Sequence, residues 1–163
     1  VIAAGATLWC VMVILPSLLA AAGGESGAPG ALVFAFFRPL CHQLDGRSFH
    51  LWGVQLAVCS RCSSIYAGFL AGTLAYPFCN SLRQRLPSGR SLLMVALIPM
   101  ALDVGAGVIG LYDVTNVTRA ATGAWFGIVI PLVVLPGAME GVAQLMTHST
   151  SRSIQPEKGL SDA

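Results

Sequence analysis

The chain has 163 residues, of which 55% are hydrophobic and only 10% are charged, and its mean hydropathy is +0.75. Soluble domains average about 25% charged residues, so this chain has too few polar side chains to cover the surface of a soluble protein. Its net charge of +2 is small and its basic residues are scattered, which argues against a nucleic-acid-binding protein. The composition predicts an integral membrane protein whose surface contacts the lipid bilayer.

Four apolar segments approach the length of about 20 residues that a helix needs to cross the hydrocarbon core. Each is expected to be helical, because lipid offers the backbone no hydrogen-bond partners. The sequence therefore predicts an all-α, multi-pass protein of the cell membrane with about four transmembrane helices. Residues 1–146 would form one transmembrane domain and residues 147–163 a polar tail. The predicted spans are residues 2–22, 64–79, 92–112 and 120–139.

Two segments between the first and second predicted spans differ in character. Residues 31–37 are apolar but too short to cross the bilayer, so we expect an interfacial or re-entrant helix there. Residues 38–62, here called the Cys/His loop, form the only long stretch that is rich in functional side chains. The chain carries no phosphate-binding loop, no Ser-His-Asp pattern and no dinucleotide fingerprint, which argues against a hydrolase or a nucleotide-dependent enzyme.

Two of the predicted spans carry a GxxxG pattern, from Gly68 to Gly72 and from Gly123 to Gly127. Small residues at this spacing let the backbones of two membrane helices approach closely. We therefore predict that the second and fourth helices pack against each other through these glycine faces.

The orientation of the bundle is predicted from its basic residues, since cytoplasmic loops carry an excess of Lys and Arg. One side would hold Arg83, Arg85, Arg90, Arg152 and Lys158, and the other Arg38, Arg47, Arg61 and Arg119. Of the latter, Arg47 and Arg61 lie within the dense run of Cys/His motifs and are discounted because they could serve its chemistry. The remaining balance places the C-terminus in the cytoplasm and the Cys/His loop on the extracytoplasmic side.

The Cys/His loop holds three of the five cysteines and two of the three histidines within 22 residues. Cys59 and Cys62 stand immediately before the second predicted span. The N–H groups at a helix N-terminus favour a thiolate, and the positive charge of Arg61 adds to this effect. Such a thiolate is a better metal ligand and also a more available nucleophile.

One interpretation of the loop is a zinc-type metal site. Cys59 and Cys62 have the spacing of one half of a structural zinc site, and Cys41 would be a third ligand. His42 or His50 would be the fourth ligand, and His50 is sterically easier because neighbouring residues such as Cys41 and His42 point in different directions.

Three other interpretations remain open. Cys59 and Cys62 could be the reactive pair of a membrane thiol–disulfide oxidoreductase, with Cys41 as the exchanging partner. The cysteines could instead form a plain disulfide that ties the loop down. The protein could also be a non-catalytic accessory subunit of a membrane complex, for which the glycine faces and short connections are suitable.

The order of short motifs in this region resembles a family of uncharacterised prokaryotic membrane proteins with a domain of unknown function. The motifs are Cys-His-Gln from Cys41, Arg-Ser-Phe from Arg47, Cys-x-Arg-Cys from Cys59 and Ile-Tyr-x-Gly from Ile65, and the pattern continues to Gly127. Ser63 and Ser64 depart from the family, which tends to have a glycine before the Ile-Tyr pair. The resemblance implies a functional site at these positions, but it supplies no activity.

One carboxylate, Asp103, lies in the middle of the third predicted span. A charged side chain at the centre of a bilayer costs about 2.5–3.5 kcal/mol on insertion scales, so it is expected to be paired. Its candidate partners are Arg119, at the start of the fourth span, and a motif arginine, Arg47 or Arg61. These charges would support the site from beneath the Cys/His loop, either as a structural pair or as a proton relay.

Overall fold

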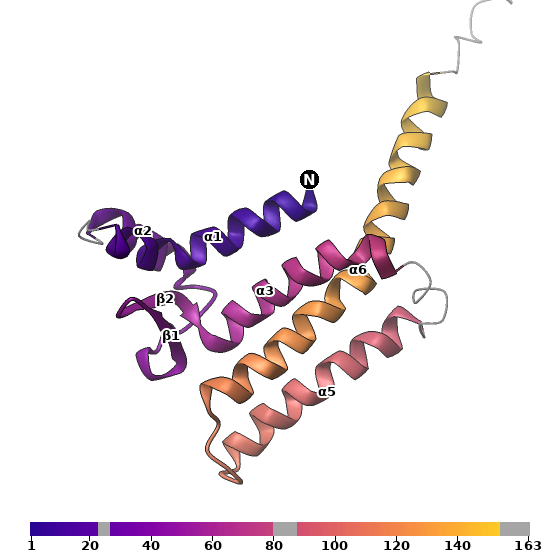
Figure 1. Cartoon of the computed structure of the whole chain (residues 1–163). Helices are drawn as coiled ribbons and strands as arrows, with labels where there is room; N and C mark the ends of the chain where they lie inside the picture. The colour runs from indigo at the N-terminus through magenta and orange to yellow at the C-terminus, as the bar shows by residue number, and fades with distance from the viewer. Residues whose placement is uncertain (23–26, 80–87, 154–163) are drawn as a thin grey trace, which may run out of the picture.

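A computed structural model of the protein describes residues 1–22, 27–79 and 88–153. Four long helices lie side by side in the order α1, α3, α6, α5, and a short helix with a β-hairpin covers one end (Figure 1). The elements are α1 (Ile2–Ala21), α2 (Ala28–Phe37), the 3-10 turn η1 (Asp45–Arg47), β1 (Ser48–Leu51), β2 (Val54–Cys59), α3 (Ser60–Ala75), the 3-10 turn η2 (Tyr76–Cys79), α5 (Gly89–Val108) and α6 (Asn116–Ser153).

Three helices in the described part of the chain are long and apolar enough to cross a membrane. They are Ile2–Ala21, Gly89–Val108 and Asn116–Ala138. At most 28% of the residues in the most apolar stretch of each are buried inside the protein, so most of their surface is left for lipid. The first, third and fourth predicted spans correspond to these helices, and the short apolar helix expected at residues 31–37 is α2.

The second predicted span, residues 64–79, matches the structure less well. The helix here, α3, begins four residues earlier, at Ser60, and ends at Ala75, with the turn η2 continuing to Cys79. Its 16 residues measure about 24 Å, which is shorter than a typical hydrocarbon core. The earlier start means that Arg61 and Cys62 belong to the helix and not to the loop.

The Cys/His loop, expected to be an irregular connection, contains regular structure. It contains an antiparallel hairpin in which Leu51 pairs with Val54. The two residues between the strands, Trp52 and Gly53, both have positive φ angles, of 52° and 77°. A two-residue turn of this kind matches the right-handed twist of the flanking strands and favours glycine. The Trp-Gly pair between two apolar runs was therefore a hairpin signal that the helical interpretation overlooked.

The glycine faces of α3 and α6 pack against each other, as predicted. A Cβ atom added at Gly68 would lie 2.6 Å from the backbone oxygen of Ala124, and one added at Gly123 would lie 2.6 Å from that of Arg61. Real Cβ atoms do not approach backbone atoms this closely, so only glycine permits the observed spacing. Two further glycines make equally close approaches, Gly72 and Gly127.

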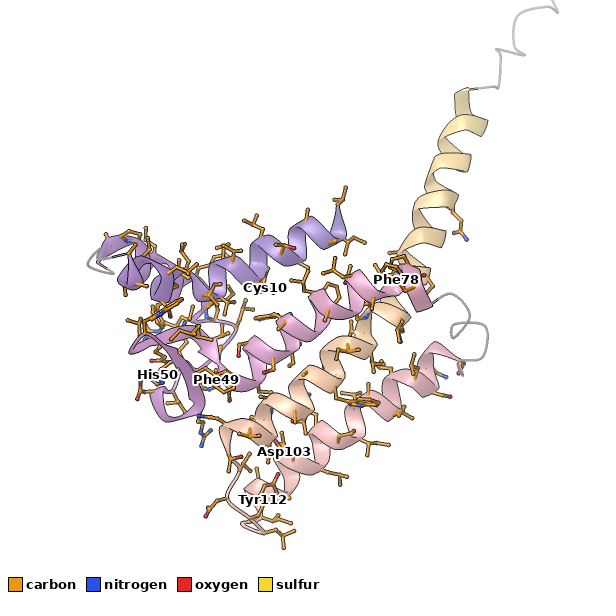
Figure 2. All side chains as sticks on the ribbon, in the orientation of Figure 1. Cys10, Phe49, His50, Phe78, Asp103 and Tyr112 are labelled. Atoms are coloured by element: carbon orange, nitrogen blue, oxygen red, sulfur yellow. The ribbon has the colours of Figure 1, made fainter. Side chains whose placement is uncertain are left out.

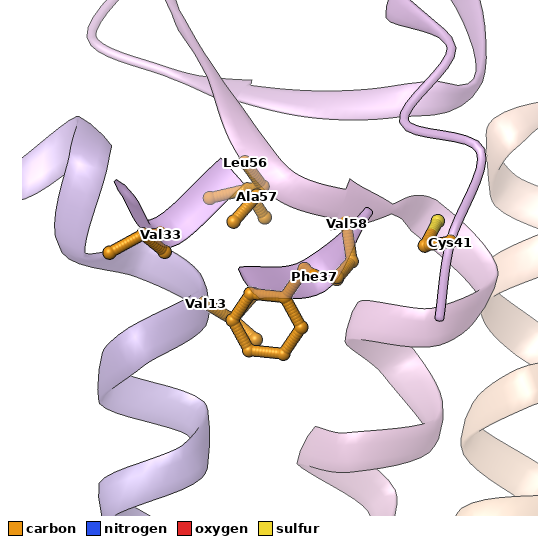
Figure 3. Packing of buried hydrophobic residues seen from close by; sticks show 7 residues of the cluster. All are labelled: Val13, Val33, Phe37, Cys41, Leu56, Ala57 and Val58. Atoms are coloured by element: carbon orange, nitrogen blue, oxygen red, sulfur yellow. The ribbon is translucent and has the colours of Figure 1, made fainter. Parts of the chain in front are cut away.

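The most closely packed apolar core lies at one end of the bundle, where α1, α2 and β2 meet. Its buried members are Val13, Val33, Phe37, Cys41, Leu56, Ala57 and Val58 (Figure 3). Figure 2 shows that many side chains along the helices point outward instead of into a common core. The hairpin end is thus packed like a small globular domain, whereas the helices rely on contact with lipid.

The last helix extends far beyond the others (Figure 1). The first residues of the predicted polar tail, 147–153, belong to α6, which ends at Ser153. Residues 154–163 of the predicted tail lie outside the described residues.

Replacing Gly127 with valine should force α3 and α6 apart, because the new side chain would meet the backbone of Ile65. We expect a loss of about 1–3 kcal/mol in the free energy of unfolding in detergent, the usual cost of overpacking. Gly105→Val in α5 is the matched control, since no atom lies within 4 Å of a Cβ added there. Equal losses in the two variants would contradict the proposed packing.

Candidate metal centre

Three cysteines from three different elements converge at the hairpin end of the bundle. Cys41 follows α2, Cys59 is the last residue of β2, and Cys62 lies in the first turn of α3. Their sulfur atoms all lie within 4.8 Å of one another, and all three are free thiols. The structure therefore brings together the three cysteines that the sequence pattern singled out.

Cys41 is the most deeply placed of the three, with 7% of its surface exposed. Its backbone N–H donates to the carbonyl of Phe37 at 3.0 Å, so the last turn of α2 fixes its position. Its sulfur accepts a hydrogen bond from the backbone N–H of Cys59 at 3.2 Å. Figure 3 shows the Cys41 sulfur next to Val58, at the edge of the apolar core. The ligand is thus held by backbone contacts on both sides.

Cys59 caps the N-terminus of α3, which places its sulfur near unpaired backbone N–H groups. A hydrogen bond with the Cys62 thiol, together with the backbone N–H groups of Cys62 and Arg61, lowers the pKa of Cys59 to about 5.

Two glutamines, which the sequence analysis passed over, hold the Cys41 segment in place. The side-chain amide of Gln43 donates to the carbonyls of Phe34 and Ala57, both at 2.8 Å, and so ties the segment to α2 and β2. Gln55 in turn donates to the carbonyl of Gln43 at 2.9 Å. Gln43 has a positive φ angle of 52°, which fits a sharp turn of the chain directly after His42. The glutamine of the Cys-His-Gln motif thus fixes the backbone next to Cys41.

A third polar contact joins the site to α6. The buried hydroxyl of Ser60 donates to the side-chain oxygen of Asn116 at 3.1 Å, and the Asn116 amide donates to the carbonyl of Gly46 at 3.5 Å. Asn116 is the first residue of α6, so this contact anchors the start of α6 to the start of α3. The sequence offered only weak signals for it, because the partners are 56 and 70 residues apart.

Neither histidine joins the three sulfurs. His50 lies in β1 (Figure 2). It contacts the carboxylate of Asp45 at 2.9 Å, and 40% of its side chain is exposed. His42 follows Cys41 directly and is exposed. The set of close ligand atoms in the described residues consists of Cys41, Cys59 and Cys62 alone. The fourth ligand expected from the sequence is therefore not supplied by His42 or His50 in this conformation.

The buried carboxylate of Asp103 is paired with a motif arginine, one of the two kinds of partner predicted. It accepts hydrogen bonds from the guanidinium of Arg61 and from the hydroxyl of Tyr112. Its side chain is 4% exposed and that of Arg61 is 19% exposed. Figure 2 shows Asp103 and Tyr112 near one another at the same end of the bundle. Arg61 thus stands between the two cysteines in the chain and connects them to α5.

The other two arginines that the sequence offered as partners for Asp103 lie elsewhere. Arg47 is exposed at the end of η1, and Arg119 is half-buried in the first turn of α6. The ion pair found for Asp103 within the described residues joins it to Arg61 and to neither of them. Tyr112, which the sequence analysis did not consider, completes the environment of the carboxylate.

A family model described as "Predicted membrane protein (DUF2085)" matches residues 41–133. The chain belongs to this family. The matched region begins at Cys41 and contains Cys59, Cys62, Arg61 and Asp103. The resemblance to a family of uncharacterised membrane proteins is thereby confirmed.

Two archaeal relatives are similar over much of the same region. An uncharacterized protein of Methanocaldococcus jannaschii is 38% identical over 104 residues, which are 64% of this chain and 67% of the relative. An uncharacterized protein of Methanothermobacter thermautotrophicus is 33% identical over 92 residues, which are 56% of this chain and 81% of the relative. No solved structure matches the chain.

In the reduced, metal-free protein, iodoacetamide should alkylate Cys59 at pH 6–7, because its pKa is lowered to about 5 and the thiolate is present above that pH. Peptide mass spectrometry across a pH series would give the midpoint. In Cys62→Ala the midpoint should rise toward the ordinary thiol value, since the largest stabilising contact is removed. Alkylation of Cys59 only above pH 8 in the unaltered protein would contradict this account.

Replacing Arg61 with methionine should leave the buried Asp103 carboxylate without its counter-charge. Breaking a buried ion pair in this way costs about 3–5 kcal/mol, which would be measured as the free energy of unfolding in detergent. The double variant Arg61→Met/Asp103→Leu should regain most of the loss, because no unpaired charge is left. A double variant as unstable as Arg61→Met would show that the pair is not what stabilises this region.

Proposed function

We propose that this membrane protein binds a soft metal ion, of which zinc is the best match, through the thiolates of Cys41, Cys59 and Cys62. The observation that supports this proposal is the convergence of three free thiols from separate segments within 4.8 Å. Sulfur ligands select zinc and other thiophilic ions over magnesium or calcium, which take oxygen ligands.

The spacing of the three sulfurs suits a zinc ion. Zinc–sulfur bonds are about 2.3 Å long, so two sulfurs of one tetrahedral site lie about 3.8 Å apart. Sulfurs already within 4.8 Å of one another need only small side-chain rotations to reach that separation. No backbone rearrangement is required, because Cys41 and Cys59 are already joined by a hydrogen bond.

The hydrogen bonds around the sulfurs also favour a metal-bound thiolate cluster. The Cys41 sulfur accepts the N–H of Cys59, and Cys59 is the N-cap residue of α3, beside the N–H groups of its first turn. Such contacts orient thiolate ligands and reduce the negative charge that they carry. Together with the N-terminus of α3, they make it easier to gather several thiolates at one place.

The proposal includes a topology. We take α3 with η2 as a fourth, short membrane segment, because its glycine face is covered by α6 along its length. We place the Cys/His loop on the extracytoplasmic side from the distribution of basic residues. Of the residues on the opposite side, Arg83, Arg85 and Lys158 lie outside the described residues. The exposed apolar faces of α1, α5 and α6 are left to lipid and to any further membrane subunits.

A second candidate function is thiol–disulfide exchange by Cys59 and Cys62. One observation favours it: the lowered pKa of Cys59 beside a second thiol is typical of a reactive pair. In that case the purified protein would hold no metal, and its count of free thiols would fall when a quinone is added and recover on reduction. The convergence of a third thiol, Cys41, favours the metal site over this alternative.

Purification under anaerobic conditions in the presence of zinc should yield about one zinc per chain by elemental analysis, the stoichiometry of a single site. Cys41→Ser, Cys59→Ser and Cys62→Ser should each lower this content strongly, because every one removes a ligand. Cys10→Ser is the matched control, since Cys10 is a free thiol in α1 outside the cluster. Absence of zinc, or an equal loss in Cys10→Ser, would contradict the proposal.

A further inference from the structure

The described residues offer three ligands to an ion at this centre and no fourth. No other Cys, His, Asp or Glu side chain of the described residues joins the group within 4.8 Å. His50 is occupied by Asp45 on the exposed side of the hairpin, and His42 is exposed. Structural zinc sites are closed by four protein ligands, whereas sites that react keep one position open.

Two further Cys or His residues have backbone positions far from the sulfurs. Cys79 ends η2, at the opposite end of α3 from Cys59, and the 16 residues of α3 alone measure about 24 Å. His148 lies 32 residues beyond Asn116 in α6, about 48 Å along the helix. Since Asn116 is the residue of α6 that touches Ser60, His148 stands far from the sulfurs.

The loop around the centre is held together without help from an ion. Gln43 ties the Cys41 segment to α2 and β2, and Gln55 ties the same segment to β2 through the Gln43 carbonyl. The Ser60–Asn116 contact fixes the start of α3. A structural metal site supplies folding energy that the chain cannot supply alone. Here these hydrogen bonds and the apolar core already specify the fold of the loop. A bound ion is therefore not needed to hold the loop together.

The open position would face away from the core. Cys41 is buried against Val58 and Phe37, whereas Cys59 and Cys62 are only half-buried. An ion bound by the three sulfurs is therefore covered on the Cys41 side and approachable from the side of the other two.

Charge decides which kind of molecule fits. Three thiolates and a divalent ion carry one net negative charge, and the nearby guanidinium of Arg61 is engaged by Asp103. The N-terminus of α3 offsets about half a charge. A second negative charge in this half-buried place would be repelled, whereas an uncharged donor adds none.

We propose that the Cys41–Cys59–Cys62 centre keeps one coordination position open and that this position takes a small uncharged donor molecule from outside the chain. The inference rests on the proposed metal-binding function and adds the class of ligand that the bound ion accepts. A metal site with an open position can exchange ligands or react, whereas a closed structural site would only stabilise the hairpin.

The test uses Co²⁺ in place of zinc in the full-length protein in detergent, because cobalt reports its ligands by visible absorption. Imidazole, an uncharged donor, should shift the absorption bands in a saturable way. Azide, a small anion, should need at least about tenfold higher concentration for a comparable shift, owing to charge repulsion. His42→Ala and His50→Ala should leave both the bands and the imidazole response unchanged.

The outcomes separate the two proposals. Bands that respond to imidazole support the open position. Bands that respond to neither probe, or that change in His42→Ala or His50→Ala, show a closed site and overturn this inference while metal binding itself stands. Absence of Co²⁺ bands in the unaltered protein, when zinc is also not bound, overturns the proposed function and this inference with it.

Discussion

The close approach of α3 and α6 is the constraint on which the rest of the structure depends. Gly68 and Gly72 from one helix and Gly123 and Gly127 from the other leave no room for side chains between the two backbones. One result is that the carbonyl of Arg61 lies against Gly123, which aligns the first turn of α3 with the first turns of α6. The contact between Ser60 and Asn116 agrees with this alignment.

This alignment also explains how a polar site can exist beside an apolar bundle. The charged and hydrogen-bonding side chains gather at the hairpin end, where they can find partners, and most of the helix surface is left apolar. Asp103 is the exception within a long helix, and it is balanced by Arg61 and Tyr112. Since Arg61 belongs to the same turn as Cys62, the intramembrane carboxylate and the thiol cluster share one supporting side chain.

Much of this architecture was accessible from the sequence because it depends on local composition. Apolar length predicted the three long helices, the GxxxG patterns predicted the α3–α6 contact, and the cost of an unpaired carboxylate predicted a partner for Asp103. The convergence of Cys41, Cys59 and Cys62 was also expected, since the Cys-x-x-Cys spacing and an upstream cysteine are typical of a metal site.

The parts that escaped prediction depend on contacts between distant segments or on backbone conformation. The hairpin was missed because its strands are short and one of them continues directly into a helix, which blurs the change of periodicity at Cys59. The roles of Gln43 and Asn116 could not be predicted, because their amides donate to carbonyls of segments that are brought close only by folding. His50 was favoured as a ligand because it is not adjacent to Cys41 in the chain, but in the structure it contacts Asp45 and lies outside the group of close sulfurs.

The dependence of α3 on α6 has a consequence for the order in which the protein is assembled during synthesis. α3 is short, begins with Ser60, Arg61 and Cys62, and covers its glycine face only against α6. The ribosome makes α5 and then α6 after α3, so α3 must wait for its partner. The glycine face of α3 is therefore covered only after α6 has been made. The hydrogen bonds that hold Cys41 to Phe37 and to Cys59 join segments that are made earlier, so the thiol cluster can form before the helix pair does.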